Sequence, residues 1–308
     1  MKIVYLKHQS IDKQKWDECI ANSQQGIAYA YSWYLDAVFN NWSALVMDDY
    51  EAVFPLTIQS KFGFSYFFNP IFAMQFGVFS TQELTKEMQQ RFYKSLPKGI
   101  QMYDFSVNSS NQFCPKYFRV TQKECQYVDL NAPYNEIASN YSTNLKRNLN
   151  KAIKTNLTIR YSTSTEDVIS LFQQNRGKNI KDIKHNHYNV LNTLILNGIE
   201  KEKIKIIECY DDREIIAAGF FSYANKRIIY HKGGTNNKGK KYGAMHLIVD
   251  FLIRTHQNSD WILDFGGSSI PSVKQFNRNF SKDQYTYLQL QKSWWIFRMI
   301  RKIKNSIK

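Results

Sequence analysis

The sequence predicts an α/β (α+β) protein made of two similar halves. Segments with the apolar alternation of strands and segments with helical periodicity follow one another along all 308 residues. Each half has the same predicted order, which is a strand, helices, three strands, a helix and two further strands. Matching positions are offset by about 160, as for Asp104 and Asp264 (264 − 104 = 160). We therefore expect a duplicated α/β domain.

The repeat is visible at five places along the chain. A predicted strand ends in Asp-Phe in both halves, at Asp104-Phe105 and at Asp264-Phe265. The other matching segments are 125–130 with 285–290, 82–96 with 242–256, the strand pair 51–59 and 62–68 with 213–223 and 227–232, and the openings 3–7 and 12–21 with 157–161 and 166–174. The alternative is that α/β units resemble one another through composition alone.

Composition excludes disorder and indicates an anionic partner. Apolar residues make up 43% of the chain, enough for a substantial core, and aromatic residues make up 15%. The net charge is +15, from 41 basic and 26 acidic residues. Such an excess favours a nucleic acid, a phospholipid surface, a nucleotide cofactor or a sugar phosphate as partner.

The cysteines and the chain termini indicate a cytoplasmic protein without metal. Cys19, Cys114, Cys125 and Cys209 form no Cys-x-x-Cys pair, so we expect buried free thiols in a reducing compartment. The first residues include no long apolar run, and no segment reaches the length of a membrane span. No phosphate-binding loop and no nucleophile elbow is present, so ATP hydrolysis and serine hydrolase chemistry are not expected.

A long amphipathic helix, roughly 134–154, is predicted between the two halves. Its apolar stripe is formed by Leu145, Leu149, Ala152 and Ile153. The opposite face is basic, and it includes Lys146, Arg147, Lys151 and Lys154. These side chains either form a solvated surface or bind a phosphate or another anionic group of a substrate, as we propose for Arg147 and Lys151.

The C-terminal residues 294–308 predict a second amphipathic helix. Apolar residues fall on one helical face, and basic residues occupy the rest, next to Trp294 and Trp295. Aromatic and basic residues in this arrangement suit the interface of an anionic membrane. The alternative is a helix that packs on the protein itself or on a second subunit.

Residues 213–290 combine the features expected of a site. Two strands lead to Gly233-Gly234 and a lysine-rich loop, and a helix opens at Gly243-Ala244. A buried strand then ends in Asp264-Phe265-Gly266-Gly267-Ser268, and a short helix follows. Glycine at a strand end permits positive φ and the close approach of a ligand. In sheets of this kind, ligands bind at the strand ends.

The tandem halves, the basic segment 146–152, Gly243-Ala244 and the Asp-Phe-Gly-Gly-Ser strand end resemble the tandem GNAT-fold acyltransferases. The FemABX-like group is the most similar branch, over about residues 16–290. The resemblance implies that each half is a GNAT-like domain with a mixed, mostly antiparallel sheet flanked by helices. The expected boundaries are 1–130 for the first domain, 131–156 for the connector, 157–291 for the second domain with the donor site, and 292–308 for the tail.

The same resemblance implies acyl transfer to an amine. In GNAT enzymes the donor is acetyl-CoA, whereas in Fem enzymes it is an aminoacyl-tRNA and the acceptor is a peptidoglycan precursor. Two positions differ from these patterns. Met245 stands where GNAT domains have a small residue, and Asn277 follows Phe276 where Fem enzymes often have lysine.

The opening of the helix at Gly243 is the expected donor site. A helix N-terminus offers free N–H groups and a partial positive charge, which suit a phosphate group. The residues that we expect to bind the donor are Lys232, Lys240, Lys241, Tyr242, Gly243 and Ala244. An exposed turn is the alternative for the lysine-rich loop.

Three residues are candidates for proton transfer. Tyr230 and His231 lie on the strand whose main chain, by resemblance to GNAT domains, binds the donor. Asp264 is either a base with a raised pKa or a cap of the Gly266-Gly267 turn, and its counterpart Asp104 favours the cap. For the acceptor we expect Gly266, Gly267, Ser268, Lys274, Phe276 and Asn277, together with Arg147 and Lys151. Lys274 and Arg278 either bind an anionic group or are solvated.

The sequence therefore favours a cytoplasmic N-acyltransferase, peripheral at the inner membrane surface, with no tightly bound cofactor. Acyl-CoA, such as acetyl-CoA, is the expected co-substrate, and the acceptor is a small or lipid-linked amine of the cell envelope or of a saccharide. One alternative is aminoacyl transfer from tRNA to a peptidoglycan precursor. The other is a membrane-associated protein that retains the fold without catalysis.

Overall fold

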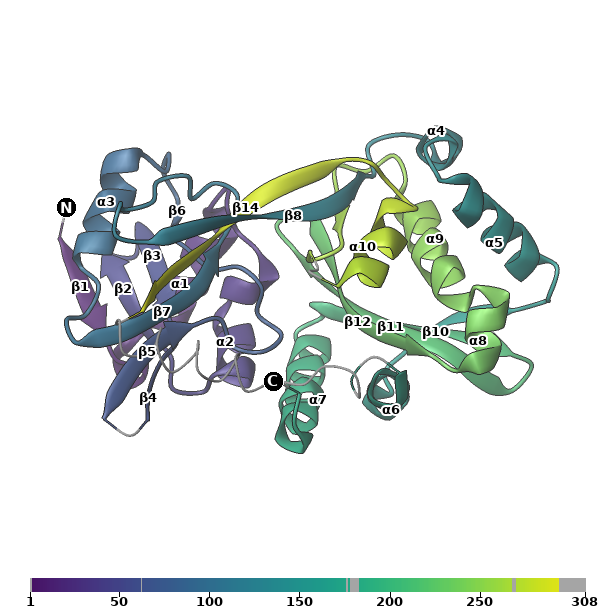
Figure 1. Cartoon of the computed structure of the whole chain (residues 1–308), viewed down its shortest axis with the longest axis horizontal. Helices are drawn as coiled ribbons and strands as arrows, with labels where there is room; N and C mark the ends of the chain where they lie inside the picture. The colour runs from purple at the N-terminus through teal and green to yellow at the C-terminus, as the bar shows by residue number, and fades with distance from the viewer. Residues whose placement is uncertain (1, 62, 176, 178–182, 268–269, 294–308) are drawn as a thin grey trace, which may run out of the picture. The chain divides into compact units, whose positions relative to one another are not determined.

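The computed structural model describes residues 2–61, 63–175, 177, 183–267 and 270–293. The chain forms two compact units, each of which combines strands with flanking helices (Figure 1). Unit 1 consists of Met1–Lys123 and Thr286–Lys308, and unit 2 consists of Glu124–Tyr285. The α/β class predicted from the sequence, with strands and flanking helices in two parts of the chain, is therefore confirmed.

The described residues of unit 1 form two groups of strands and three α-helices. The strand order in the first group is β1-β2-β3-β6, and in the second it is β4-β5-β7-β14. The strands are β1 (Ile3–Leu6), β2 (Ser43–Met47), β3 (Ala52–Leu56), β4 (Ile58–Lys61), β5 (Phe64–Phe68), β6 (Phe79–Ser80), β7 (Ile100–Val107) and β14 (Gln284–Ser293), and the helices are α1 (Lys13–Asn22), α2 (Ser32–Val38) and α3 (Lys86–Lys94). Every residue of β2 and β3 is buried, which explains their nearly continuous apolar sequences.

Aromatic side chains fill the core of unit 1. Phe67 and Phe105 stack with their ring centroids 4.3 Å apart, and Phe54 contacts both rings. Such pairs add to the free energy of burial. Phe64, by contrast, is 40% exposed. Core packing therefore explains much of the aromatic density in this half.

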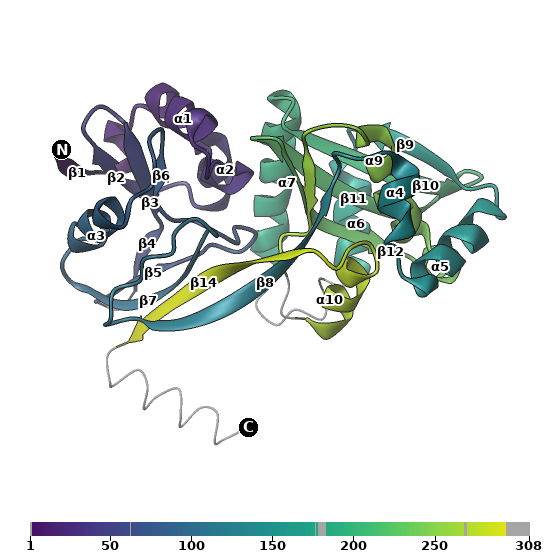
Figure 2. The same ribbon diagram turned by 90° about the horizontal axis from the view of Figure 1, so that it is seen from above.

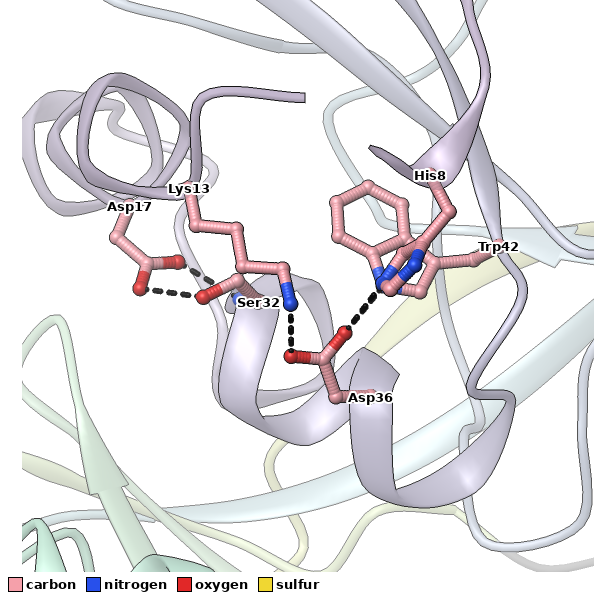
Figure 3. Close-up of polar contacts among 6 residues, drawn as sticks. All are labelled: His8, Lys13, Asp17, Ser32, Asp36 and Trp42. Atoms are coloured by element: carbon pink, nitrogen blue, oxygen red, sulfur yellow. Dashed lines mark hydrogen bonds and ion pairs between the residues drawn. The ribbon is translucent and has the colours of Figure 1, made fainter. Parts of the chain in front are cut away.

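A polar cluster fixes the N-terminal helices of unit 1 (Figure 3). The Asp36 carboxylate of α2 accepts hydrogen bonds from His8 (2.9 Å), Lys13 (2.7 Å) and the Trp42 indole (2.9 Å). Burial alone would raise the pKa of Asp36, but these donors hold it below its usual value. The cluster joins three segments of the chain, so we interpret it as structural.

Unit 2 contains one continuous run of strands, in the order β8-β13-β12-β11-β10-β9. Its strands are β8 (Arg119–Asp129, from Glu124), β9 (Thr158–Ser162), β10 (Ile204–Asp211), β11 (Glu214–Ala224), β12 (Arg227–Thr235) and β13 (Ile262–Asp264). The pair β12–β13 is parallel and the other pairs are antiparallel, which confirms the mixed, mostly antiparallel sheet.

Helices cover both faces of this sheet (Figure 1). Helices α6 (Thr165–Asn175) and α7 (His185–Glu200) lie on one face. On the other face, α9 (Ala244–His256) packs with α4 (Tyr134–Ser139), α5 (Thr143–Ile153), α8 (Asn237–Tyr242) and α10 (Pro271–Arg278). We call these the α6 face and the α9 face.

The single helix predicted for 134–154 is wrong. The chain forms α4 and α5 instead, because Ser142 interrupts the helix and caps α5 by accepting from the Leu145 amide at 3.1 Å. Leu145, Leu149 and Ala152 are buried as predicted, whereas Ile153 is 60% exposed. Both helices belong to the core of unit 2.

The last strands of the two halves are exchanged between the units. The repeat predicted that 125–130 closes the first half and 285–290 the second. Instead, Tyr127–Asp129 pairs with β13 in unit 2, and Leu288–Ser293 pairs with β7 in unit 1. The chain therefore passes between the units inside β8 and inside β14, which Figure 2 shows as two long strands.

Several other predictions concern the whole chain. Within the described ranges, no helix is long and apolar enough to cross a membrane, and no cluster of His, Cys, Asp and Glu could hold a metal ion. The four cysteines are free thiols, of which Cys114 is half-buried and the others are buried. The predicted amphipathic helix 294–308 lies outside the described residues.

Candidate functional site

Strand β12 separates from its parallel neighbour after its first three residues. Arg227 to Ile229 pair with β13, but β13 ends at Asp264. Gly266 and Gly267 follow with φ of +68° and +75°, a left-handed conformation that turns the chain away and strongly favours glycine. No described strand pairs with this edge of β12 beyond Ile229. We call the stretch from Tyr230 to Thr235 the open edge.

A β-bulge lies where the open edge begins. Phe221 pairs with Tyr230, but Phe220 pairs with Lys232, so His231 is an extra residue in β12. The His231 ring stacks on Phe220 with centroids 5.1 Å apart, and its Nε2 lies 2.7 Å from the Ser222 hydroxyl. Tyr230 instead stacks on Phe221, which belongs to the core on the α9 face. Tyr230 therefore faces α9, whereas His231 and Lys232 both lie on the face of Phe220.

Met245 packs against two glycines rather than towards the helix N-terminus. An added Cβ on Gly233 would lie 2.8 Å from the Met245 methyl group, and one on Gly219 would lie 3.7 Å from its sulfur. Gly219 and Gly233 are direct partners on β11 and β12. The bulky residue that replaces the small one of GNAT domains is therefore accommodated by the sheet, and it is 9% exposed.

Helix α9 begins after Gly243, as predicted. Gly243 has φ of +73° and separates α8 from α9. The first backbone amides of α9 therefore have no carbonyl acceptor in a preceding helical turn. The lysine-rich segment before it is the short helix α8, not the predicted loop. A Cβ on Gly243 would meet Asn148 of α5 at 3.4 Å.

Basic side chains from two helices lie beside this N-terminus. Arg147 and Lys151 flank Asn148 on α5, and Lys240 and Lys241 lie in the last turn of α8. All four are exposed, and none forms an ion pair in the described part of the chain. We call these four residues the α5–α8 basic surface. The structure therefore brings predicted donor-binding and acceptor-binding residues together.

Asp264 is fully engaged in hydrogen bonds. Its carboxylate, 2% exposed, accepts from the Gly266 amide (2.7 Å), the Tyr285 hydroxyl (2.8 Å), the Cys125 thiol (2.9 Å) and the Arg227 guanidinium. This geometry favours the cap over the base. Sequence reasoning missed Arg227 and Tyr285, because their meeting with Asp264 depends on strand register.

The predicted acceptor-binding residues of α10, the helix that follows Gly266 and Gly267, have different surroundings. Lys274 and Arg278 pair with Glu124 of β8, so that carboxylate is the anionic group they meet. Phe276 contacts Tyr230 and His246, with ring centroids 6.4 and 4.8 Å apart. Asn277 is 1% exposed, and no described residue forms a hydrogen bond with either polar atom of its side chain. Ser268 lies outside the described residues.

His246, in the first turn of α9, is a site residue that the sequence did not reveal. Its ring packs between Phe276 and Phe280, and burial lowers its pKa to about 4. An added Cβ on Gly243 would lie 3.7 Å from its Nδ1. A neutral imidazole therefore lies close to the start of α9. The only sequence indication is its position three residues after Gly243.

No protein-family model and no curated protein matches this sequence. Among solved structures, the chain is similar to FemX, with a TM-score of 0.67 and 10% identity over 94% of this chain and 97% of that chain. It is also similar to the C-terminal domain of a putative lysylphosphatidylglycerol synthetase from Agrobacterium fabrum, with a TM-score of 0.57 and 10% identity over 91% of both chains. A tandem GNAT protein from the clavulanic acid biosynthesis pathway is similar with a TM-score of 0.52 and 6% identity, over 94% of this chain and 98% of that chain. The chain thus has the FemABX-like tandem GNAT fold.

Proposed function

We propose that this protein is an N-acyltransferase whose unit 2 binds the acyl donor. The observation that carries the proposal is the open edge of β12, which begins where β13 ends. Main-chain groups at an unpaired strand edge bind an extended ligand as they would another strand. The similarity to FemX and to a tandem GNAT protein supports the same class of enzyme.

The donor that we propose is an acyl-CoA, such as acetyl-CoA, which binds transiently. Its extended arm would pair with the open edge, and its phosphates would contact the first turn of α9. Helix N-termini favour anions, and the α5–α8 basic surface adds charge at the same place. Gly243 keeps side-chain atoms away from this approach.

Amine acylation also requires a proton acceptor. Asp264 already accepts four hydrogen bonds. Burial lowers the pKa of His231 to about 3, so this ring holds a proton poorly at neutral pH. Tyr230, at the start of the open edge, is the remaining candidate. Its hydroxyl would take the proton from the attacking amine while it gives its own proton to the sulfur of the departing CoA.

For the acceptor we propose an amine of a cell-envelope or saccharide-related molecule. The fold similarity to a lysylphosphatidylglycerol synthetase domain supports an acceptor at the envelope, including a lipid-linked one. The predicted membrane-surface contact of residues 294–308 would suit such an acceptor.

Thermal melting with acetyl-CoA, longer acyl-CoAs and free CoA tests the donor. A ligand that binds only the native state raises the melting temperature. We expect a rise for the native protein and none for Gly243→Val, because a branched residue is strained at positive φ and would meet Asn148. Gly63→Val is the matched control, since Gly63 has φ of +78° and open space around it. It should retain the rise.

Aminoacyl transfer from tRNA is the second candidate. The net charge of +15 and the unpaired α5–α8 basic surface favour it. If no CoA compound raises the melting temperature, tRNA binding is measured at increasing salt. Tight binding that weakens as the salt concentration rises supports this candidate. The salt dependence should be smaller in a variant with glutamine at all four positions of the α5–α8 basic surface. Absence of both responses would favour a protein without catalysis.

A further inference from the structure

We propose that Lys232, on the α6 face of the β12 bulge, binds an anionic group of the acceptor, which is a carboxylate or a phosphate. The inference rests on the proposed function, because it describes the acceptor of that reaction. The acceptor is then an amine that also carries a negative charge.

The register of the sheet places Lys232 on the face opposite α9. Gly234 faces α6, since an added Cβ there would lie 2.2 Å from the Leu171 main chain. Gly234 pairs with Ala218, and Phe220, two residues further along β11, pairs with Lys232. Paired residues and residues two apart share a face. Lys232 therefore lies beside His231 on the α6 face, at the open edge.

Lys232 carries a charge that no described residue neutralises. It is half-buried, and no described residue forms an ion pair or hydrogen bond with its ammonium. Arg227 on the same strand pairs with Asp264, and Lys238 beyond it pairs with Asp211 and Glu214. A cation withdrawn from water requires compensation by an opposite charge. No described residue supplies that compensation, and we assign it to a bound anion.

The surroundings of Lys232 offer no acidic partner from the neighbouring strands. Glu208 lies on the same face but belongs to β10, where its carboxylate accepts from Tyr210 at 2.7 Å. Burial lowers the pKa of Lys232 to about 8, so the ammonium is still largely protonated at pH 7. An anion bound there would lie next to the main chain that we assign to the acyl donor, and it would hold the acceptor amine near the reacting group.

A site-resolved titration of the lysine amines tests this inference on the full chain. Lysines are methylated reductively with ¹³C, and the Lys232 resonance is identified by its loss in Lys232→Met. Sodium phosphate and sodium acetate are then added in separate arms. We expect one of them to raise the apparent pKa of this resonance, because an anion stabilises the charged form. An unchanged pKa with both anions would overturn the inference.

Lys226→Met is the control, since Lys226 precedes the same strand, is exposed and pairs with Asp260. It should leave the response of Lys232 unchanged. Since a basic protein binds anions at many places, only a response that is absent in Lys232→Met supports the inference.

Steady-state rates separate this inference from the proposed function. With acetyl-CoA as donor, ethanolamine is compared with phosphoethanolamine and with β-alanine. In Lys232→Met, the ratio of KM for the anionic amine that responds to KM for ethanolamine should rise about tenfold. In Lys232→Arg this ratio should stay close to the native value, because arginine keeps the positive charge. Equal rates for neutral and anionic amines in both proteins would refute the inference alone. Anion binding at Lys232 without any turnover would refute the proposed function alone.

Discussion

At the scale of single residues, Asp264 and Asn277 show opposite ways of burying a polar group. Asp264 has four donors around its carboxylate, whereas the Asn277 amide has no hydrogen-bond partner among the residues that the structure describes. A buried polar group without partners lowers stability. Residues retained at such a cost in a native structure are candidates for ligand contact. Asn277 therefore remains a candidate for binding the acceptor.

Asn277→Leu should raise the free energy of unfolding by about 1 to 3 kcal/mol, because it removes an unpaired buried amide without opening a cavity. Urea denaturation measures the change. Asn279→Leu is the matched control, since the Asn279 side chain is also buried but accepts a hydrogen bond from Ser142 at 2.9 Å. It should lower the free energy of unfolding. Equal destabilisation by both substitutions would contradict the interpretation.

At the scale of helices and strands, the sequence predicted what local chemistry encodes. Gly243 marks the start of α9, because its left-handed conformation is a local property of glycine. The break between α4 and α5 was missed, although Ser142 is a typical helix cap. The bulge at His231 could not be predicted, because it depends on how β11 and β12 align.

The packing of α9 on the sheet depends on the fit between Met245 and Gly233. Gly233→Ala should lower the free energy of unfolding by about 1 to 3 kcal/mol, since its Cβ would lie 2.8 Å from the Met245 methyl group and 2.7 Å from the Ala218 carbonyl oxygen. Met245→Ala in the same chain should recover part of this loss. A double-mutant cycle by urea denaturation should give a coupling of about 0.5 to 3 kcal/mol.

Met88, buried in α3 of unit 1, provides the comparison. Met88→Ala and Gly233→Ala should destabilise additively, because the two residues lie in different units. If the Gly233–Met88 cycle gives the same coupling energy as the Gly233–Met245 cycle, then the contact between Gly233 and Met245 does not explain the coupling.

At the scale of the whole molecule, the sequence predicted two halves but not which strand completes which sheet. Residues 125–130 and 285–290 have similar strand patterns, so periodicity alone cannot assign them. The structure assigns Glu124–Tyr285 to unit 2, a continuous segment, and builds unit 1 from both ends of the chain. The meeting of Arg227, Asp264 and Tyr285 also depends on this arrangement, because all three lie within unit 2.

The two units should therefore differ when the chain is divided. A fragment of residues 124–285 keeps the part of β8 that pairs with β13, together with β9 to β13, and should fold alone, with a cooperative melting transition by circular dichroism. A fragment of residues 1–123 lacks β14, whose Leu290 is fully buried and pairs with Phe105 of β7. It should be unfolded or strongly destabilised, and a peptide of residues 284–293 should restore its transition. If 1–123 melts like the full chain without the peptide, then β14 is not required for unit 1.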